Sequence, residues 1–139
     1  MIWDRDAIRA GALVALVFAI PFSLAGRVIA DRDGDSTLLV WLNLGAVLGF
    51  VLGAGCAAWV QRVDAPLSHG LVTAIGTYVA AQAVFVAVRL VIGAEVRWFS
   101  VLFNLTVTLG AGLIGGLLGG RLRSRGILPR AATNSSEGP

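Results

Sequence analysis

Apolar residues fall into four long runs that are separated by short polar stretches. The runs cover residues 8–28, 37–60, 70–92 and 98–120, and each is close to the ~20 residues that a helix needs to cross a bilayer. Because backbone groups find no partners in lipid, each run is expected to be an α-helix. Short links force neighbouring helices to run antiparallel. The pattern predicts an all-α, polytopic membrane protein whose residues 1–125 form a four-helix transmembrane up-down bundle.

Composition and tryptophan positions agree with this prediction. Apolar residues make up 57% of the 139 residues and charged residues only 14%, so a soluble domain would have too little polar surface. Trp41 and Trp59 lie near the two ends of the second run, and indole rings favour the lipid headgroup boundary. The lipid bilayer is therefore the expected surrounding of the chain. Residues 126–139 lose the apolar periodicity and are predicted to form a flexible cytoplasmic tail.

The basic residues predict an orientation. All eleven are Arg, which we interpret as the nucleotide-composition bias of a high-GC bacterium, and this favours a bacterial inner (plasma) membrane. Seven lie on the side that holds both termini and four on the other, so the positive-inside rule predicts cytoplasmic N- and C-termini. The short basic tail lacks the helical or aromatic presentation that nucleic-acid binding needs.

A cleaved signal peptide is the alternative at the N-terminus. Arg5 and Arg9 precede an apolar stretch that ends in small residues at 23–25, as signal peptides do. Cleavage there would leave three spans. Asp4 and Asp6 are unusual in a signal peptide, however, and removal of the first helix would leave another helix without a partner. We therefore expect the first span to be retained.

Glycine recurs at every fourth position of the second and fourth runs. The two sets are Gly45, Gly49 and Gly53 in the second run and Gly112, Gly116 and Gly120 in the fourth. Helices in a bilayer associate through close backbone approach, which glycine permits. We expect these sets to be helix-packing ridges within one chain. Association of chains into a homo-oligomer through one ridge is the alternative.

The second and fourth runs match in part when they are aligned without gaps. The alignment that places Asn43 opposite Asn104 also places Gly49 opposite Gly110 and Gly55 opposite Gly116. The first and third runs match only loosely. Because glycine-rich helices also match by composition, two interpretations remain: a tandem pair of helical hairpins that form parallel repeats, or chance similarity.

Polar residues inside the runs are few. No Asp, Glu or Lys lies at mid-depth, whereas proton-coupled transporters usually carry an intramembrane carboxylate. The residues that remain as a candidate polar site are Asn43, Gln82, Arg89 and Asn104. Hydrogen bonding between helices is the simpler role for such residues, together with Tyr78, Thr106 and Thr108. Arg27 and Arg89 are expected to snorkel to the boundary or to pair with Asp31 and Glu95.

Metal and catalytic chemistry have little support in the sequence. Residues 31–36 begin like an EF-hand calcium loop, but Ser36 and Leu42 stand where that loop needs Gly and Glu. His69 has no His or Cys nearby to complete a metal site and is expected to be an interfacial residue. The Ser residues are scattered without a His partner for nucleophilic catalysis. We therefore expect no metal, no cofactor and no enzymatic activity.

Three segments carry a resemblance to known proteins. They are the glycine-rich end of the second run at 49–58, the Pro66-Leu-Ser-His-Gly-Leu sequence before and at the start of the third, and the glycine-rich close of the fourth at 112–120. With them, residues 8–125 resemble small bacterial four-span, glycine-rich membrane proteins of unknown function. The resemblance implies a multi-pass membrane protein and carries no activity with it.

Two functions follow as hypotheses. The first is a structural or accessory subunit of the cell envelope that acts through glycine-mediated helix packing, within a larger membrane complex. The alternative is a small channel or transporter for a lipid-linked or anionic solute, because Arg89 near Gln82 suits a phosphate-bearing ligand.

Overall fold

The described part of the chain is almost entirely helical. The computed structural model describes residues 3–32 and 37–127, which form α1 (Arg5–Arg32), α2 (Thr37–Val60), α3 (Pro66–Val91) and α4 (Trp98–Ser124). By length and composition all four helices can cross a membrane. The prediction of an all-α four-helix membrane bundle is confirmed. Residues 33–36 of the calcium-like turn, and the tail from residue 128 onward, lie outside the described residues.

The helix ends differ in part from the ends of the apolar runs. α2 coincides with the predicted run 37–60, whereas α1 and α4 continue into charged sequence. A charged residue ends an apolar run without ending the backbone hydrogen bonding, since its long side chain can reach water from a helical backbone. α3 begins at Pro66, before the predicted residue 70. A proline fits the first helical position because the N–H that it lacks would be unpaired there.

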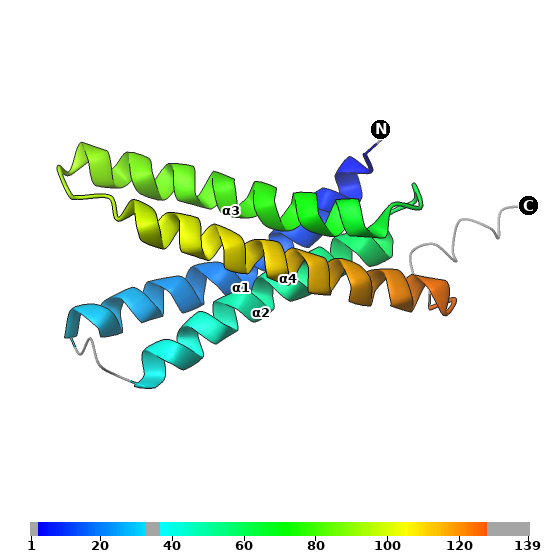
Figure 1. Cartoon of the computed structure of the whole chain (residues 1–139), viewed down its shortest axis with the longest axis horizontal. Helices are drawn as coiled ribbons and strands as arrows, with labels where there is room; N and C mark the ends of the chain where they lie inside the picture. The colour runs from blue at the N-terminus through cyan, green and yellow to red at the C-terminus, as the bar shows by residue number, and fades with distance from the viewer. Residues whose placement is uncertain (1–2, 33–36, 128–139) are drawn as a thin grey trace, which may run out of the picture.

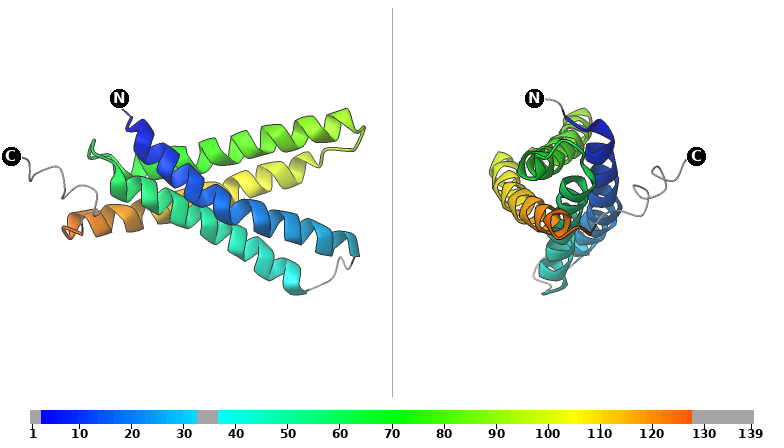
Figure 2. Two further views of the ribbon diagram at one scale, coloured as in Figure 1. Left: turned by 180° about the vertical axis from the view of Figure 1, so that it is seen from behind. Right: turned by 90° about the vertical axis from the view of Figure 1, so that its right-hand side faces the viewer.

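The helices form two crossed hairpins, α1 with α2 and α3 with α4 (Figure 1). We call the end where α1 and α3 finish the hairpin end, and the end where they begin the terminal end. The two hairpins diverge at the hairpin end and cross toward the terminal end (Figure 1; Figure 2). α2 and α3 each contact the other three helices, and no contact joins α1 to α4 within the described residues. α2 and α3 therefore connect α1 to α4.

Glycines bring α2 against α1. Gly45, Gly49 and Gly53 of α2 all face α1, and a Cβ added at Gly53 would lie 2.5 Å from the carbonyl oxygen of Gly11. A Cβ added at Gly49 would lie 2.5 Å from the Cβ of Phe18. These separations are shorter than van der Waals contact, so a side chain would not fit at either position at this distance between the two backbones.

Glycines of α4 face two different helices. Gly112, Gly116 and Gly120 face α3, where a Cβ added at Gly70 would lie 2.7 Å from the Cα of Gly116. Gly115 and Gly119 face α2 instead, and Cβ atoms added there would overlap carbonyl oxygens of that helix. Adjacent residues can serve two neighbours because each residue turns the helix by about 100°.

The two hairpins share a topology, but the glycines that the sequence alignment pairs do not pack equivalently. Gly55 faces α4, whereas its counterpart Gly116 faces α3. Gly49 faces α1, whereas a Cβ added at its counterpart Gly110 would meet no atom within 4 Å. The alignment therefore pairs glycines that have different surroundings.

Small side chains fill the bundle, and large ones cover its outside. The buried apolar side chains among the described residues are Tyr78 and eight alanines. Leu, Val, Ile and Phe side chains are exposed along all four helices, with Val91 as much as 86% exposed. In water such a continuous apolar surface would drive association. In a bilayer lipid tails solvate it, so the arrangement is that of a membrane-embedded bundle.

Candidate functional site

The four residues of the candidate polar site do not come together. Asn43 on α2 and Asn104 on α4 are exposed, while Gln82 and Arg89 on α3 are half-buried. The Asn43 side-chain amide donates to the carbonyl oxygen of Leu39, four residues earlier on the same helix, at 2.8 Å. Among the described residues no hydrogen bond joins either asparagine to Gln82 or Arg89.

Most polar side chains inside the spans bond to their own helix. The hydroxyls of Thr106 and Thr108 donate to carbonyl oxygens four residues earlier, at 3.2 and 2.8 Å. The expected bonding between helices is therefore wrong for Asn43, Thr106 and Thr108, because a short side chain on a helix always has the carbonyl of the preceding turn in reach. It holds for Tyr78, whose hydroxyl donates to the Val101 carbonyl oxygen on α4 at 2.6 Å.

Gln82 lines a shallow groove between α3 and α4. The groove has a volume of about 280 Å³, and its walls include Tyr78, Val86, Trp98 and Leu105. The Oε1 atom of Gln82 is buried and accepts no hydrogen bond within the described part of the chain. A single uncharged amide in apolar walls suits an apolar or weakly polar ligand better than an anion.

Two arginines converge on one aromatic ring near the hairpin end. The Cζ atoms of Arg27 on α1 and Arg89 on α3 lie 4.5 and 5.3 Å from the centre of the Phe85 ring. Both distances are within the range of cation–π attraction. We call Arg27, Phe85 and Arg89 the arginine cluster. The candidate polar site that the sequence predicts contains neither Arg27 nor Phe85, because the pairing of α1 with α3 is not encoded in any local pattern.

The expected ion pair between Arg89 and the Glu95 carboxylate is not present, and the one between Arg27 and Asp31 stays a prediction. Arg89 Nη1 donates to the backbone carbonyl oxygen of Glu95 at 2.5 Å, not to its carboxylate, because the turn that ends α3 brings the Glu95 backbone back to the helix. The Nε atom of Arg89 is buried without a partner among the described residues. The side chain of Asp31 lies outside what the structure describes. The arginine cluster therefore carries positive charge with no described acid to balance it.

A second polar cluster closes the terminal end. His69, expected at the membrane interface, is buried and only 2% exposed. Its Nε2 accepts a hydrogen bond from the backbone N–H of Asp4 at 3.0 Å, and its Nδ1 lies 2.8 Å from the carbonyl oxygen of Ala65. Since a carbonyl only accepts, Nδ1 is the donor of this second bond. No sequence signal joins Asp4 to His69, because 65 residues separate them.

Asp4 ties the start of α1 to the link between α2 and α3. Its Oδ1 accepts from the Ala7 N–H at 3.2 Å, as an N-cap residue does, and its Oδ2 accepts from the Arg62 N–H at 3.1 Å. Partial burial raises the pKa of the Asp4 carboxyl. Hydrogen bonds from the backbone N–H groups of Ala7, Arg62 and Asp6 lower it by more, so the pKa lies below its usual 3.8.

Gln61 completes the terminal cluster. It is fully buried, and its Oε1 accepts from the backbone N–H groups of Val63 and Ala65 at 2.8 and 3.3 Å. The bonds made by Asp4, Gln61 and His69 therefore all go to backbone groups or to one another. Such bonds fix the geometry of the link and leave this cluster with a structural role.

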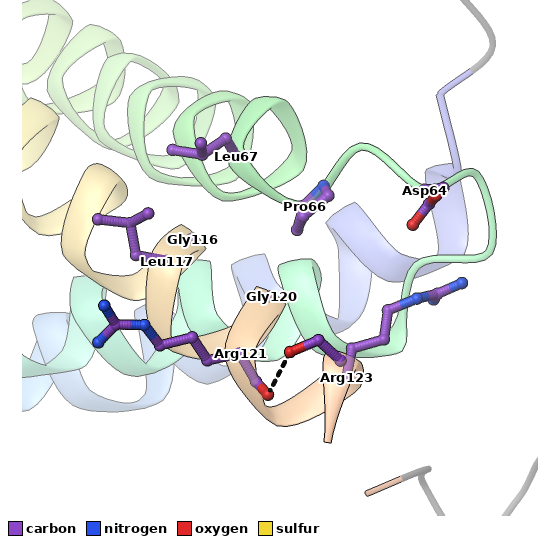
Figure 3. Close-up of a pocket in the computed structure, with 9 residues that line it drawn as sticks. Asp64, Pro66, Leu67, Gly116, Leu117, Gly120, Arg121 and Arg123 are labelled. Atoms are coloured by element: carbon purple, nitrogen blue, oxygen red, sulfur yellow. Dashed lines mark hydrogen bonds between the residues drawn. The ribbon is translucent and has the colours of Figure 1, made fainter. Parts of the chain in front are cut away.

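A groove at the terminal end runs between the start of α3 and the end of α4 (Figure 3). It measures about 480 Å³, with Gly116 and Gly120 along one side and Pro66 opposite them. Arg121 and Arg123 flank it but extend in opposite directions (Figure 3). Because these cations do not converge, the groove offers less to a single anion than the arginine cluster does.

Neither a metal-binding group nor a similar known protein indicates a role for these sites. Among the described residues no group of three or more His, Cys, Asp and Glu could hold a metal ion. Comparison of the chain with family models, with curated protein sequences and with solved structures finds no match. The resemblance to small four-span proteins therefore rests on the four apolar helices, and these identify the chain as an integral, multi-pass membrane protein.

Proposed function

We propose that this membrane protein is a structural or accessory subunit of the bacterial cell envelope. It sits in the inner membrane with both termini in the cytoplasm and acts by packing against a helix of another membrane protein. The role requires no catalysis. It would use the same close backbone approach that holds α1, α2, α3 and α4 together.

Two glycines within the spans support this proposal. Gly76 on α3 and Gly110 on α4 would each accept a Cβ without meeting an atom within 4 Å. The other described glycines inside helices all meet a neighbouring helix. Ala80, four residues after Gly76, is also exposed, so a small-residue face on α3 is open to the surroundings. A partner helix could approach there as closely as α2 approaches α1.

The two open glycines are informative because glycine destabilises a helix. A glycine inside a helix is less favourable than alanine by about 1 kcal/mol. At Gly49 or Gly53 close packing with α1 offsets that cost, but at Gly76 and Gly110 no contact within the chain does so. A contact with another protein would offset it.

The test compares surface and control variants in native membranes. A tagged chain is extracted in mild detergent, and the mass and stoichiometry of its complex are measured. The Gly76→Leu/Gly110→Leu double variant should lose most of the complex without a fall in melting temperature, since both sites are open and leucine has the higher helix propensity. Val91→Leu, at a highly exposed position, should change neither. A wild-type chain that runs as a single subunit, or a complex unaffected by the double variant, would contradict the proposal.

A small channel or transporter is the second candidate. The observation that favours it is the groove between α3 and α4, where the unpaired Oε1 of Gln82 faces apolar walls. Purified protein in liposomes should then move a solute, and Gln82→Leu should abolish the flux while the melting curve stays unchanged. Loss of flux that is matched by loss of stability would favour the accessory role instead.

A further inference from the structure

The arginine cluster gathers two cations from different hairpins. Arg27 belongs to α1 and Arg89 to α3, and their Cζ atoms lie 4.5 and 5.3 Å from the centre of the Phe85 ring. Because both distances end at the centre of the same ring, the two Cζ atoms are at most about 10 Å apart, the sum of the two distances. One phosphate can bridge two guanidinium groups once their long side chains turn toward it, and each presents a planar fork of N–H donors that matches phosphate oxygens.

Within the described residues the arginine cluster has no carboxylate to balance its charge. No described carboxylate lies within 4.0 Å of either guanidinium, and the ion pair that is found, between Arg9 and Asp6, lies at the terminal end. The Nε–H of Arg89 is buried without an acceptor among the described residues. Two like charges near a low-dielectric layer repel each other, and a buried donor without an acceptor is costly. An anion that bridges the two guanidinium groups would reduce the repulsion between them.

The position of the cluster along the helices matches the headgroup layer. Arg27 is five residues from the end of α1 at Arg32, and Arg89 is two residues from the end of α3 at Val91. At ~1.5 Å per residue, both lie within about 8 Å of the helix ends. Phosphate groups of phospholipids lie at this level, where the long side chain of an arginine can reach them.

The surroundings of the cluster distinguish a lipid from a free anion. Phe85 is 37% exposed, and Val84 and Val88 on the same helix are 67% and 54% exposed. These apolar side chains can contact acyl chains, whereas a free phosphate would have to give up water next to them. The headgroup of an anionic lipid can neutralise the arginines, and its acyl chains can cover the exposed apolar side chains.

We propose that the arginine cluster binds the phosphate group of an anionic lipid headgroup. Arg27 and Arg89 donate to the phosphate oxygens, and Phe85 holds the two side chains in position and contacts the lipid beneath the headgroup. Because Arg27 and Arg89 come from different hairpins, the bound lipid connects α1 to α3 near the end at which the hairpins diverge (Figure 1). This site operates independently of any protein partner.

The test measures lipid binding to the full-length chain. Purified, delipidated protein in mild detergent is titrated with phosphatidylglycerol, and bound lipid is followed by native mass spectrometry. The Arg27→Gln/Arg89→Gln double variant should bind about tenfold more weakly or worse, since charge-assisted pairs with phosphate are lost. Arg97→Gln removes an exposed cation at the same end of the bundle and should leave the affinity unchanged. Equal affinity in the wild type and the double variant, or an equal loss in Arg97→Gln, would overturn the site.

Two further experiments identify the ligand and provide variants for the case in which the double variant does not fold. Inorganic phosphate should fail to displace the lipid at millimolar concentration, and diacylglycerol, which has no phosphate, should bind the wild type no better than the double variant. Displacement by phosphate would overturn the lipid as the ligand. If the double variant does not fold, Arg27→Lys and Arg89→Lys keep the charge but lose the fork, and each should bind several-fold more weakly. Unchanged affinity in both lysine variants would count against the proposal.

Discussion

Gly115 is a position at which one added methyl group should force two helices apart. It lies on α4 against α2, where an added Cβ would overlap the carbonyl oxygen of Val51 and lie 2.8 Å from the Cβ of Ala54. It would also lie 2.9 Å from the backbone nitrogen of Gly55. None of these atoms belongs to a side chain that can rotate away. Gly115→Ala must therefore push α2 and α4 apart.

The size of the effect follows from these distances. Carbon atoms prefer separations of about 3.5–4.0 Å, so a contact at 2.8 Å requires the helices to move apart by about 1 Å. A gap of ~1 Å forfeits up to about half of the dispersion energy of the contacts that it opens. Overpacking of this kind costs about 1–3 kcal/mol. The higher helix propensity of alanine offsets about 1 kcal/mol of that cost.

Gly110→Ala is the matched control for this experiment. It has the same gain in helix propensity, but the added Cβ meets no atom within 4 Å. The difference between the two variants therefore isolates the packing cost of about 1–3 kcal/mol. Purified protein is unfolded with SDS in mixed micelles, and the free energy of unfolding is obtained from tryptophan fluorescence. Equal free energies for the two variants would refute the close approach of α2 and α4 at this position.

Orientation is tested in a Cys56→Ala background, where Gly34→Cys should react with an impermeant thiol reagent from outside and Ile127→Cys only after permeabilisation; the reverse pattern would reject cytoplasmic termini. His69→Leu removes the acceptor for the Asp4 N–H, so the free energy of SDS unfolding should fall by about 1–3 kcal/mol, and no change would contradict the buried bonds. The pKa of Asp4 is lower in the folded protein, so the unfolded chain takes up the proton first as the pH falls. The stability that the ionised Asp4 carboxylate adds to the fold is complete at pH values above its usual pKa of 3.8, and it is lost as the pH drops through the pKa of the folded protein. Unfolding measured against pH should show this acid loss in the wild type and a weaker one in Asp4→Asn.

The four helices can be predicted from local composition, because each run is apolar and long enough to cross a bilayer whatever the other runs do. The neighbours of a given glycine depend instead on how the helices cross. Gly115 and Gly116 are adjacent and chemically identical, yet the first faces α2 and the second faces α3. The regular spacing in α4 indicates close packing, but it contains no information on which helix supplies the other side.

The members of the candidate polar site are separated in the structure for a related reason. Asn43, Gln82, Arg89 and Asn104 form one candidate site in the sequence because few other polar residues lie inside the runs, but a position in a run does not specify which way a side chain points. Arg89 does lie in a cationic cluster, whereas Arg27 comes from a helix whose contact with α3 no local pattern encodes. The burial of His69 likewise depends on the start of α1 reaching the first turn of α3.

The hairpin architecture also determines the order in which the protein can assemble during synthesis. The contact between Gly11 and Gly53 needs only α1 and α2, so the first hairpin can form while the rest of the chain is still being translated. The bonds of Asp4 to Arg62 and His69 can form only when the first turn of α3 has left the ribosome. α4, which emerges last, must find both α3 and α2. We therefore expect α1 and α2 to insert and pair first. The terminal cluster should form next, when the first turn of α3 becomes available, and the packing of α4 against α3 and α2 should follow.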